Sequence, residues 1–403
     1  MSAPRGCRSG RRPRYAAFRN RVVQGGVRRF MTTRRKRLSA AALVFVASVL
    51  VFGVVLSRDA ACPSMDATAI ESAPAGVSTM QAARYHCYGD TDVIHWETVA
   101  RPELSDSSVL VHVHAVATNP LDWHYMRGKP YIMRLSSGIG RPSDVRLGQD
   151  FAGVVEAVGA NVTRFAPGDS VFGASPGAFG EYIAVRENAD IARVPDSMSL
   201  AEAAAMPVAA TTALQAVRDA GQVTTGQRVL VNGASGGVGT YAVQIAKSLG
   251  AHVTGVSSAR NVELVRSLGA DATIDYTSED FTTGTARYDV IIDNVGNHAP
   301  SVLRRVLAPA GRVVVVGGPE RDRWFGPIRN LVGALVYGWF VEPTFTGLFS
   351  ETSQVDLEYL AALVRQGRLH SVIDRQFEAP ELREAIAYQE SGRSRGKNIV
   401  IIP

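Results

Sequence analysis

The chain has 403 residues, of which 46% are hydrophobic and 20% are charged, a composition that is ordinary for a globular protein and suits two domains. Its formal net charge of +6 is concentrated at one end, because residues 1–58 contain 14 Arg or Lys and no Asp or Glu. The remaining residues carry 29 basic and 37 acidic side chains. The body is therefore mildly acidic, which excludes nucleic-acid binding as the meaning of the basic isoelectric point.

A basic leader, residues 1–37, is followed by an uncharged apolar run, residues 38–56. The run has 19 residues, enough to cross the hydrocarbon core of a bilayer as a helix. Four consecutive basic residues precede it, and the positive-inside rule would keep them in the cytoplasm and place the body across the membrane. We therefore expect a single-pass N-terminal anchor that holds the protein at a membrane.

Three alternatives remain for the same residues. The apolar run could belong to a cleaved signal peptide, the Arg34-Arg35 pair resembles a twin-arginine signal, and an Arg-rich, acid-free leader is typical of an organellar transit peptide. Each alternative would give an exported or organelle-targeted body after cleavage. Residues 57–80, rich in Ala, Ser, Thr and Pro, are expected to form a linker.

The three cysteines do not form a metal-ligand pattern or a disulfide framework. Cys7 lies in the leader, and Cys62 and Cys87 lie in or near the linker. A disulfide between Cys62 and Cys87 is possible if the body lies outside the cytoplasm, where thiols are oxidised.

Residues 81–198 show short strand-like runs separated by Gly and Pro turns. Residues 109–117 alternate strictly, and residues 151–158 form a second apolar strand. His112 and His114 share one face of the first strand, where we expect solvent rather than a metal ion. The pattern predicts a compact β domain.

The hydrophobic period changes at residue 199. Ser199 and Glu202 form a capping-box pattern, which predicts a helix over residues 201–220. Strands are then expected at residues 229–232, 252–256, 272–275, 289–293 and 312–316, with helices near 238–249, 260–268 and 298–307. This alternation predicts a doubly wound parallel sheet over residues 199–345.

The last part of the chain holds two further features. Arg329 and Asn330 interrupt the apolar segment 328–341, which favours a core or subunit-interface helix, and hence a homodimer, over a second membrane span. Residues 346–403 are expected to form a helix near 355–366, a strand near 372–377, a helix near 380–390 and a strand over 398–402.

A glycine-rich turn between the strand at 229–231 and the helix that follows it is the strongest functional signal. Backbone N–H groups and the helix dipole attract phosphate at such a turn. Gly236 would let the backbone approach a pyrophosphate, and Gly239 would let the helix pack against the strand. The residues expected to bind there are Ser235, Gly236, Gly237, Val238 and Gly239.

The end of the next strand indicates which dinucleotide is bound. An NAD site usually has an acidic residue there, which hydrogen-bonds the ribose. This chain instead has Ser257, Ser258 and Arg260, which suit a ribose 2′-phosphate. The sequence therefore predicts NADP(H).

Seven segments carry a further signal: NPLD (119–122), LGQDFAGVVEAVG (147–159), PGDSVF (167–172), ASGGVG (234–239), LGAD (268–271), DVIIDNVG (289–296) and GRVVVVGG (311–318). In this order they resemble the medium-chain dehydrogenase/reductase superfamily, and most of all its zinc-free quinone-oxidoreductase (zeta-crystallin-like) branch. The resemblance implies an α/β protein in which a GroES-like β domain, residues 81–198, is interrupted by a Rossmann domain, residues 199–345. Residues 346–403 would complete the first domain, with the binding cleft between the two.

The resemblance also implies that zinc is absent. Zinc-dependent relatives have a Cys at the position of Asn119 and Gly-His-Glu at that of Gly148, Gln149 and Asp150. A catalytic zinc needs about three Cys, His or carboxylate ligands, and the chain does not supply them there. The four-Cys structural lobe of those relatives is also missing.

Several residue roles are implied by resemblance alone. Asn119 would lie beside the nicotinamide, Asp122 would orient its loop, and Tyr125 and Tyr131 would be nearby hydrogen-bond donors. His124 stands where related quinone reductases often have Tyr. Thr211, Asn294 and Gly317 match positions of the nicotinamide pocket, and Lys247, Ser257, Ser258, Arg260 and Tyr276 match positions near the 2′-phosphate and adenosine.

These observations favour an enzyme that reduces quinones or α,β-unsaturated carbonyl compounds by hydride transfer from NADPH. Such acceptors take hydride readily without a metal, because the product is delocalised. The alternatives are an NAD(P)-dependent alcohol or aldehyde dehydrogenase and a non-catalytic, membrane-anchored NADPH-binding scaffold.

Overall fold

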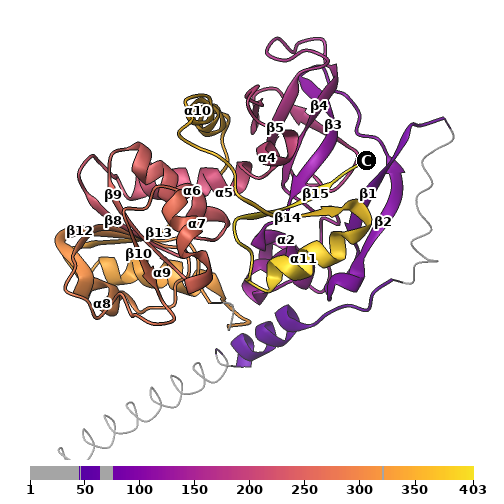
Figure 1. The fold of residues 1–403 in the computed structure, drawn as a ribbon. Helices are drawn as coiled ribbons and strands as arrows, with labels where there is room; N and C mark the ends of the chain where they lie inside the picture. Colours follow the sequence, from indigo (N-terminus) through magenta and orange to yellow (C-terminus); the bar gives the residue numbers. More distant parts are fainter. Residues whose placement is uncertain (1–44, 46, 64–75, 320–321) are drawn as a thin grey trace, which may run out of the picture. The chain divides into compact units, whose positions relative to one another are not determined.

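A computed structural model describes residues 45, 47–63, 76–319 and 322–403 (Figure 1). The chain divides into two units, residues 1–58 and residues 59–403. In the first unit residues 47–57 are helical. Within the described residues, no helix combines the length and apolarity needed to span a bilayer. The expected leader and most of the first half of the expected anchor lie outside the described residues.

The expected doubly wound sheet is present in the second unit and is parallel throughout (Figure 1). As far as the residues are described, its strands in spatial order are β10 (Ala272–Asp275), β9 (His252–Ser257), β8 (Arg228–Asn232), β11 (Tyr288–Asp293), β12 (Leu307–Val315) and β13 (Thr344–Gly347). The helices of this region are α6 (Gly237–Ser248), α7 (Val262–Ser267), α8 (Pro300–Leu303) and α9 (Pro327–Gly338). The strand order reverses beside β8, which places β9 and β11 on its two sides and opens a crevice at their carboxyl ends.

Two sequence-based predictions in this region need correction. The helix expected over 201–220 is divided into α4 (Leu200–Ala204), α5 (Pro207–Leu214) and a π-helical turn, Gln215–Ala220. Pro207 begins α5 because it lacks the N–H that a continuous helix would need at that position. The sequence analysis also did not predict β13, a short strand that closely follows the apolar segment forming α9.

The predicted capping box at Ser199 is confirmed, since its hydroxyl accepts from the Glu202 N–H and the Glu202 carboxylate accepts from the Ser199 N–H. The expected core or interface helix over 328–341 corresponds to α9. Leu331 and Ala334 are buried on one side of α9, whereas Val336 remains exposed. The homodimer therefore stays a prediction.

The β domain is a second sheet that the C-terminal segment completes, as expected. Over the described residues its strands in spatial order are β14 (Ile373–Glu378), β15 (Lys397–Ile401), β3 (Ser108–Ala117), β4 (Asp150–Val158), β5 (Ser170–Ala174) and β7 (Ile191–Arg193), with β6 (Tyr182–Arg186) pairing with β3. β1 (Thr79–Tyr85) and β2 (Ile94–Ala100) form a separate hairpin. The helices are α2 (Pro120–Arg127), α3 (Arg134–Ser137), α10 (Gln354–Arg365) and α11 (Leu382–Glu390).

The antiparallel pairing of β15 with β3 joins the two ends of the β domain. Ile399 lies opposite Ala117, and Val400 lies opposite Val116, all four buried. The parallel sheet is inserted between these two strands in the sequence. Any residue at the start of β15 is therefore carried to the end of β3, where α2 begins.

The segment that was expected to be a linker is in part attached to the β domain. Cys62 and Cys87 form a disulfide, as the sequence allowed. Asp59 forms an ion pair of 2.6 Å with Arg134, whose side chain is fully buried, and the Ala60 N–H donates to the Gly140 carbonyl. Residues 59–63 are thus held by three kinds of contact, while residues 64–75 of the expected linker lie outside the described residues.

We predict that the disulfide stabilises the body. It closes a loop with a sequence separation of 25, and a loop of this size corresponds to about 2–4 kcal/mol of unfolding free energy. Urea unfolding of the wild type should show a loss of this size when a reductant is added. The double variant Cys62→Ser/Cys87→Ser should start at the lower stability and be insensitive to the reductant. Equal stability of the oxidised and reduced wild type would contradict the prediction.

Candidate functional site

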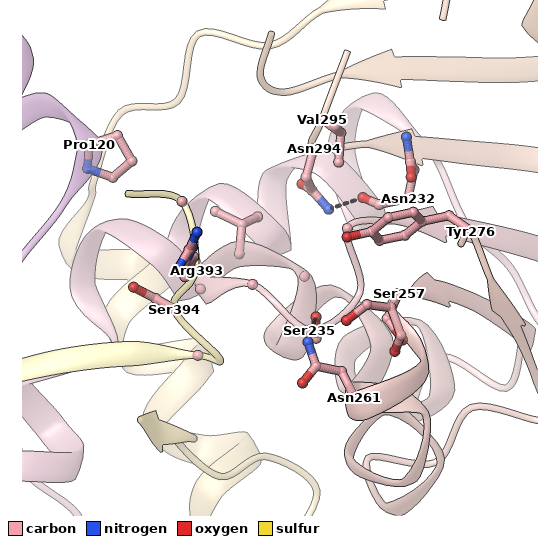
Figure 2. A pocket seen from close by; sticks show the side chains of 18 of the residues that line it. Pro120, Asn232, Ser235, Ser257, Asn261, Tyr276, Asn294, Val295, Arg393 and Ser394 are labelled. Atoms are coloured by element: carbon pink, nitrogen blue, oxygen red, sulfur yellow. Dashed lines mark hydrogen bonds between the residues drawn. The ribbon is translucent and has the colours of Figure 1, made fainter. Parts of the chain in front are cut away.

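A cavity of about 690 Å³ lies where the carboxyl ends of β8, β9 and β11 meet the β domain (Figure 2). Asn232, Ser257 and Asn294 line it at or just beyond the ends of these strands. Further lining comes from Thr118 to Pro120 before and at the start of α2, from the start of α5, and from the segment between α11 and β15. Chain segments that are far apart in sequence therefore enclose one site.

The glycine-rich turn forms one wall of the cavity. A Cβ added to Gly239 would lie 2.0 Å from the Gly233 carbonyl oxygen, so glycine is needed for α6 to pack against the turn. A Cβ added to Gly236 would meet nothing nearer than 3.5 Å, so this glycine leaves open space instead. Gly236 caps α6 without any side-chain hydrogen bond. The helix N-terminus is thus available to an anionic group in the cavity.

The end of the cavity next to β9 is lined by polar and cationic side chains. Ser257, Ser258, Arg260 and Tyr276 all line it. Arg393, from the segment between α11 and β15, lines the same cavity (Figure 2). One Nη of Arg260 donates to the backbone carbonyl oxygen of Arg393 over 3.3 Å, so Arg260 contacts the backbone of this segment.

Sequence reasoning missed Arg393 because 133 residues separate it from Arg260. The only signal is local, since Gly392 and Gly396 frame a short loop between a helix and a strand. That signal predicts a turn and gives no indication of what the turn faces.

Lys247 is not brought to the cavity. Its ammonium lies 2.8 Å from one Asp271 carboxylate oxygen and 3.1 Å from the Ala251 carbonyl oxygen at the far end of α6. These contacts hold the end of α6 against the strand that follows. Two more residues expected at the nicotinamide pocket, Thr211 and Gly317, do not line the cavity. Gly317 packs against the backbone of the lining residue Asn294, because an added Cβ would lie 2.4 Å from the Asn294 carbonyl oxygen.

Amide and carboxyl groups form the wall beside β11. The Asn232 amide donates to the Asp293 carboxyl over 2.8 Å. The Asn294 amide donates to the Asn232 backbone carbonyl over 3.0 Å (Figure 2). Burial raises the pKa of Asp293. The Asn294 side-chain oxygen is buried and has no partner within the described residues. A buried acceptor of this kind fits a ligand that carries an N–H donor, such as a carboxamide.

The opposite wall is built on Asn119, which is buried just before α2. Its amide nitrogen donates to Asp150 over 2.9 Å, and its side-chain oxygen accepts from Lys397 over 2.6 Å. Asp150 also accepts the Val208 N–H, and burial raises its pKa against the opposing effect of Lys397. Sequence reasoning did not single out Lys397, and it treated Asp150 only as a position where a zinc ligand is missing.

The other residues expected near Asn119 lie behind the cavity wall. The Asp122 carboxylate accepts the Asn119 N–H over 2.7 Å, so it orients this loop as expected, but it does not line the cavity. The Tyr131 ring packs edge-on against Trp324, and neither Tyr131 nor Tyr125 lines the cavity. His124 is buried and hydrogen-bonds the Lys129 carbonyl, and burial lowers its pKa.

Within the described residues, no three or more His, Cys, Asp or Glu side chains are grouped so that they could hold a metal ion. The positions that would supply zinc ligands in zinc-dependent relatives hold Asn119 and Gln149. The Asn119 oxygen is already bonded to an ammonium group, which repels a second cation.

Comparison with known proteins identifies both halves of the fold. Residues 105–196 match the family described as alcohol dehydrogenase GroES-like domain, and residues 268–400 match the family described as zinc-binding dehydrogenase. A quinone oxidoreductase structure from Coxiella burnetii superposes with a TM-score of 0.69 at 29% identity, covering 81% of this chain and 100% of that chain.

Similar curated proteins carry oxidoreductase names. A 2-methylene-furan-3-one reductase of Solanum lycopersicum is 33% identical, over 87% of this chain and 86% of the relative. A chloroplastic quinone-oxidoreductase homolog of Spinacia oleracea is 33% identical, over 80% of this chain and 98% of the relative. The mitochondrial NAD(P)H oxidoreductase RTN4IP1 of Homo sapiens is 32% identical, over 78% of this chain and 87% of the relative.

The buried carboxyl of Asp122 leads to a pH-dependent prediction. Burial, with a contribution from the Asp150 charge, raises the pKa of Asp122 to about 7. The folded protein therefore keeps this proton up to about pH 7, whereas the unfolded chain loses it near pH 4. The stability that this group contributes is complete below about pH 4 and is lost as the pH rises through 7.

An Asp122→Asn variant cannot ionise at this position and should gain stability relative to the wild type as the pH rises. Melting temperatures measured from about pH 5 to about pH 8 would show the difference increasing. Asp275→Asn is the control, because the Asp275 carboxyl is exposed and its pKa is lowered, chiefly by the Thr277 N–H. Its difference from the wild type should stay constant, and a constant difference for Asp122→Asn would refute the prediction.

Proposed function

This chain is a nicotinamide-dependent oxidoreductase of the medium-chain dehydrogenase/reductase superfamily, in its zinc-free quinone-oxidoreductase branch, and we propose that it reduces quinones or α,β-unsaturated carbonyl compounds with NADPH. The observation that carries the proposal is the form of the cavity. It is lined by a helix N-terminus that has no side-chain cap, by Arg260 and Arg393, and by Asn119, which is bonded to an ammonium group.

NADPH, when bound, supplies the hydride, and the residues of this chain hold and orient the reacting groups. The proposed pyrophosphate site is formed by Ser235, Gly236, Gly237, Val238 and Gly239, which all line the cavity. Ser257, Ser258, Arg260 and Tyr276, together with Arg393, are the proposed site of the ribose 2′-phosphate. Arginine suits this group because its planar guanidinium forms paired hydrogen bonds with phosphate.

At the other end of the cavity, Asn294 offers its unpaired oxygen to the nicotinamide carboxamide. Asn119 fixes the position of the wall against which the ring and the acceptor lie, and Asp122 orients the loop that carries Asn119. Thr211 and Gly317, which lie behind the lining, would shape the nicotinamide pocket through the residues in front of them. Tyr125 and Tyr131 remain proposed donors at the acceptor side.

Zinc is not needed for this chemistry. A quinone or enone accepts hydride without a Lewis acid, because the hydroquinone or enolate that forms is delocalised. An alcohol dehydrogenase lacks that assistance and depends on a metal at the oxygen. The domain limits proposed for this reading remain 81–198 for the GroES-like domain, 199–345 for the Rossmann domain and 346–403 for the completing segment.

We predict that a panel of quinones, enones, ketones and alcohols will separate the candidate activities. NADPH oxidation should occur with quinones or enones, survive a chelator and be accompanied by no alcohol oxidation. Asn119→Ala should lower kcat about a hundredfold, because small displacements of reacting groups carry a cost of this size. Robust alcohol oxidation without quinone or enone turnover would favour the dehydrogenase, and no turnover at all would favour a binding scaffold.

We predict that the protein binds NADPH at least about tenfold more tightly than NADH, roughly 1.4 kcal/mol. Arg260→Ala and Arg393→Ala should each weaken NADPH and leave NADH nearly unchanged, because only NADPH carries the 2′-phosphate. Lys247→Ala is the matched control, since this lysine is paired with Asp271 away from the cavity. Fluorescence titration measures all four proteins, and equal affinity of the wild type for the two cofactors would defeat the prediction.

We propose that residues 1–58 direct the body out of the cytoplasm, either as a membrane anchor or as a cleaved targeting sequence. The curated relatives with chloroplastic and mitochondrial names support targeting to an organelle, and the Cys62–Cys87 disulfide suits an oxidising compartment. The basic, acid-free leader fits either role.

Cell fractionation of a C-terminally tagged protein will locate the body. Carbonate-resistant, full-length protein in the membrane fraction would identify residues 38–56 as an anchor, the outcome that the sequence favours. A soluble protein that has lost its leader would identify a targeting sequence. Full-length protein in the cytosol with reduced cysteines would rule out both.

A further inference from the structure

Lys397 is a buried cation to which the proposed reaction assigns no role. Its ammonium lies 2.6 Å from the Asn119 side-chain oxygen, 3.0 Å from the Thr118 carbonyl oxygen and 3.2 Å from an Asp150 carboxylate oxygen. The side chains of Lys397 and Asp150 are 4% and 0% exposed. All three donors of the ammonium thus have an acceptor within the chain, so its function is to hold these groups.

The groups that Lys397 holds belong to the walls of the cavity. Thr118 and Asn119 lie between the end of β3 and the start of α2, and Asp150 begins β4. The second Asp150 oxygen accepts the N–H of Val208, which lies at the start of α5. Thr118, Asn119, Val208 and Lys397 all line the cavity. The pair formed by the Lys397 ammonium and the Asp150 carboxylate therefore connects β15 and β4 with the start of α5 and with the segment between β3 and α2.

The same strand also contacts the phosphate-binding turn. Gly396, immediately before Lys397, donates its N–H to the Ser235 carbonyl over 3.0 Å. The Lys397 methylenes pack on Gly237, where an added Cβ would lie 3.2 Å from Lys397 Cδ. Gly396 and Lys397, at the start of β15, thus contact both the turn and Asn119.

The pair also determines which way the Asn119 amide faces. The side-chain oxygen faces the Lys397 ammonium, and the nitrogen faces the Asp150 carboxylate. A flipped amide would place its N–H groups against the ammonium and its oxygen against the carboxylate, and both contacts would be repulsive. The orientation of Asn119 is therefore fixed by charge.

We propose that Lys397 is a positioning residue for hydride transfer, which sets the place and orientation of Asn119 relative to the turn that binds the pyrophosphate. This inference rests on the proposed function, because it concerns the alignment of nicotinamide and acceptor in that reaction. A purely structural ion pair is the competing explanation, since buried pairs often contribute little to stability beyond balancing each other's charge.

The test compares Lys397→Met with the double variant Lys397→Met/Asp150→Asn, which is neutral and close in shape to the original pair. With NADPH and a simple quinone, Lys397→Met should lower kcat about a hundredfold, since Asn119 is no longer held. The NADPH Kd should change by less than about threefold, because the helix N-terminus and the arginines are unaltered. The double variant should recover the melting temperature, because no buried charge is left unpaired, but not kcat.

Arg218→Met is the matched control, since Arg218 forms a 2.8 Å ion pair with the buried Asp356 away from the cavity. It should lower the melting temperature and leave kcat unchanged. Recovery of kcat in the double variant, or wild-type kcat in Lys397→Met, would overturn the inference while leaving the proposed function intact. Absence of any turnover by the wild type would instead refute the proposed function and the inference with it. If Lys397→Met does not fold, the double variant decides.

Discussion

The pairing of β15 with β3 is the constraint on which the site depends. The chain leaves the β domain after β7, forms the nucleotide-binding sheet, and returns as β14 and β15 to lie against the strand at which α2 begins. Without this return the glycine turn would still form, because its chemistry is local. The cavity would nevertheless lack one wall, since Arg393 and Lys397 lie just before or at the start of β15.

The two ends of the cavity use positive charge in different ways. At the proposed phosphate site the N-terminus of α6 has no side-chain cap, so its N–H groups are available to an anionic ligand. At the Asn119 end the ammonium of Lys397 is completely occupied by oxygen atoms of the chain. The N-terminus of α6 is therefore arranged to bind a ligand, whereas the Lys397 ammonium is arranged to hold Asn119 in place. This division suits an enzyme in which the cofactor supplies the reactivity and the protein supplies alignment.

The Asn119 wall contains three buried titratable groups, Asp122, Asp150 and Lys397. Asp150 accepts hydrogen bonds from Lys397, Asn119 and Val208, so its burial is compensated by three donors. Asp122 accepts no hydrogen bond from the Lys397 ammonium, and burial raises its pKa to about 7, so it is neutral below about that pH. A neutral Asp122 beside Asp150 avoids two like charges at close range in an environment of low dielectric.

The sequence by itself determined the features whose cause is local. The glycine turn, the capping box at Ser199 and the alternation of strands and helices depend on residues within a few positions of one another, and the structure contains each of them. The order of motifs was specific enough to indicate the family and the two-domain arrangement. Pro207 was also visible in the sequence, but the helix around it was extended through the break that it causes.

Only the tertiary structure decided which distant residues meet. The place of Lys247 in the chain after the glycine turn suggested a contact with the cofactor, but its ammonium forms an ion pair with Asp271 instead. Arg393 and Lys397 showed no pattern of their own, since 133 residues separate Arg393 from Arg260 and 278 separate Lys397 from Asn119. A local pattern fixes how a segment folds, whereas the wall that it forms depends on strand pairing across the whole chain, and no spacing in the sequence records that pairing.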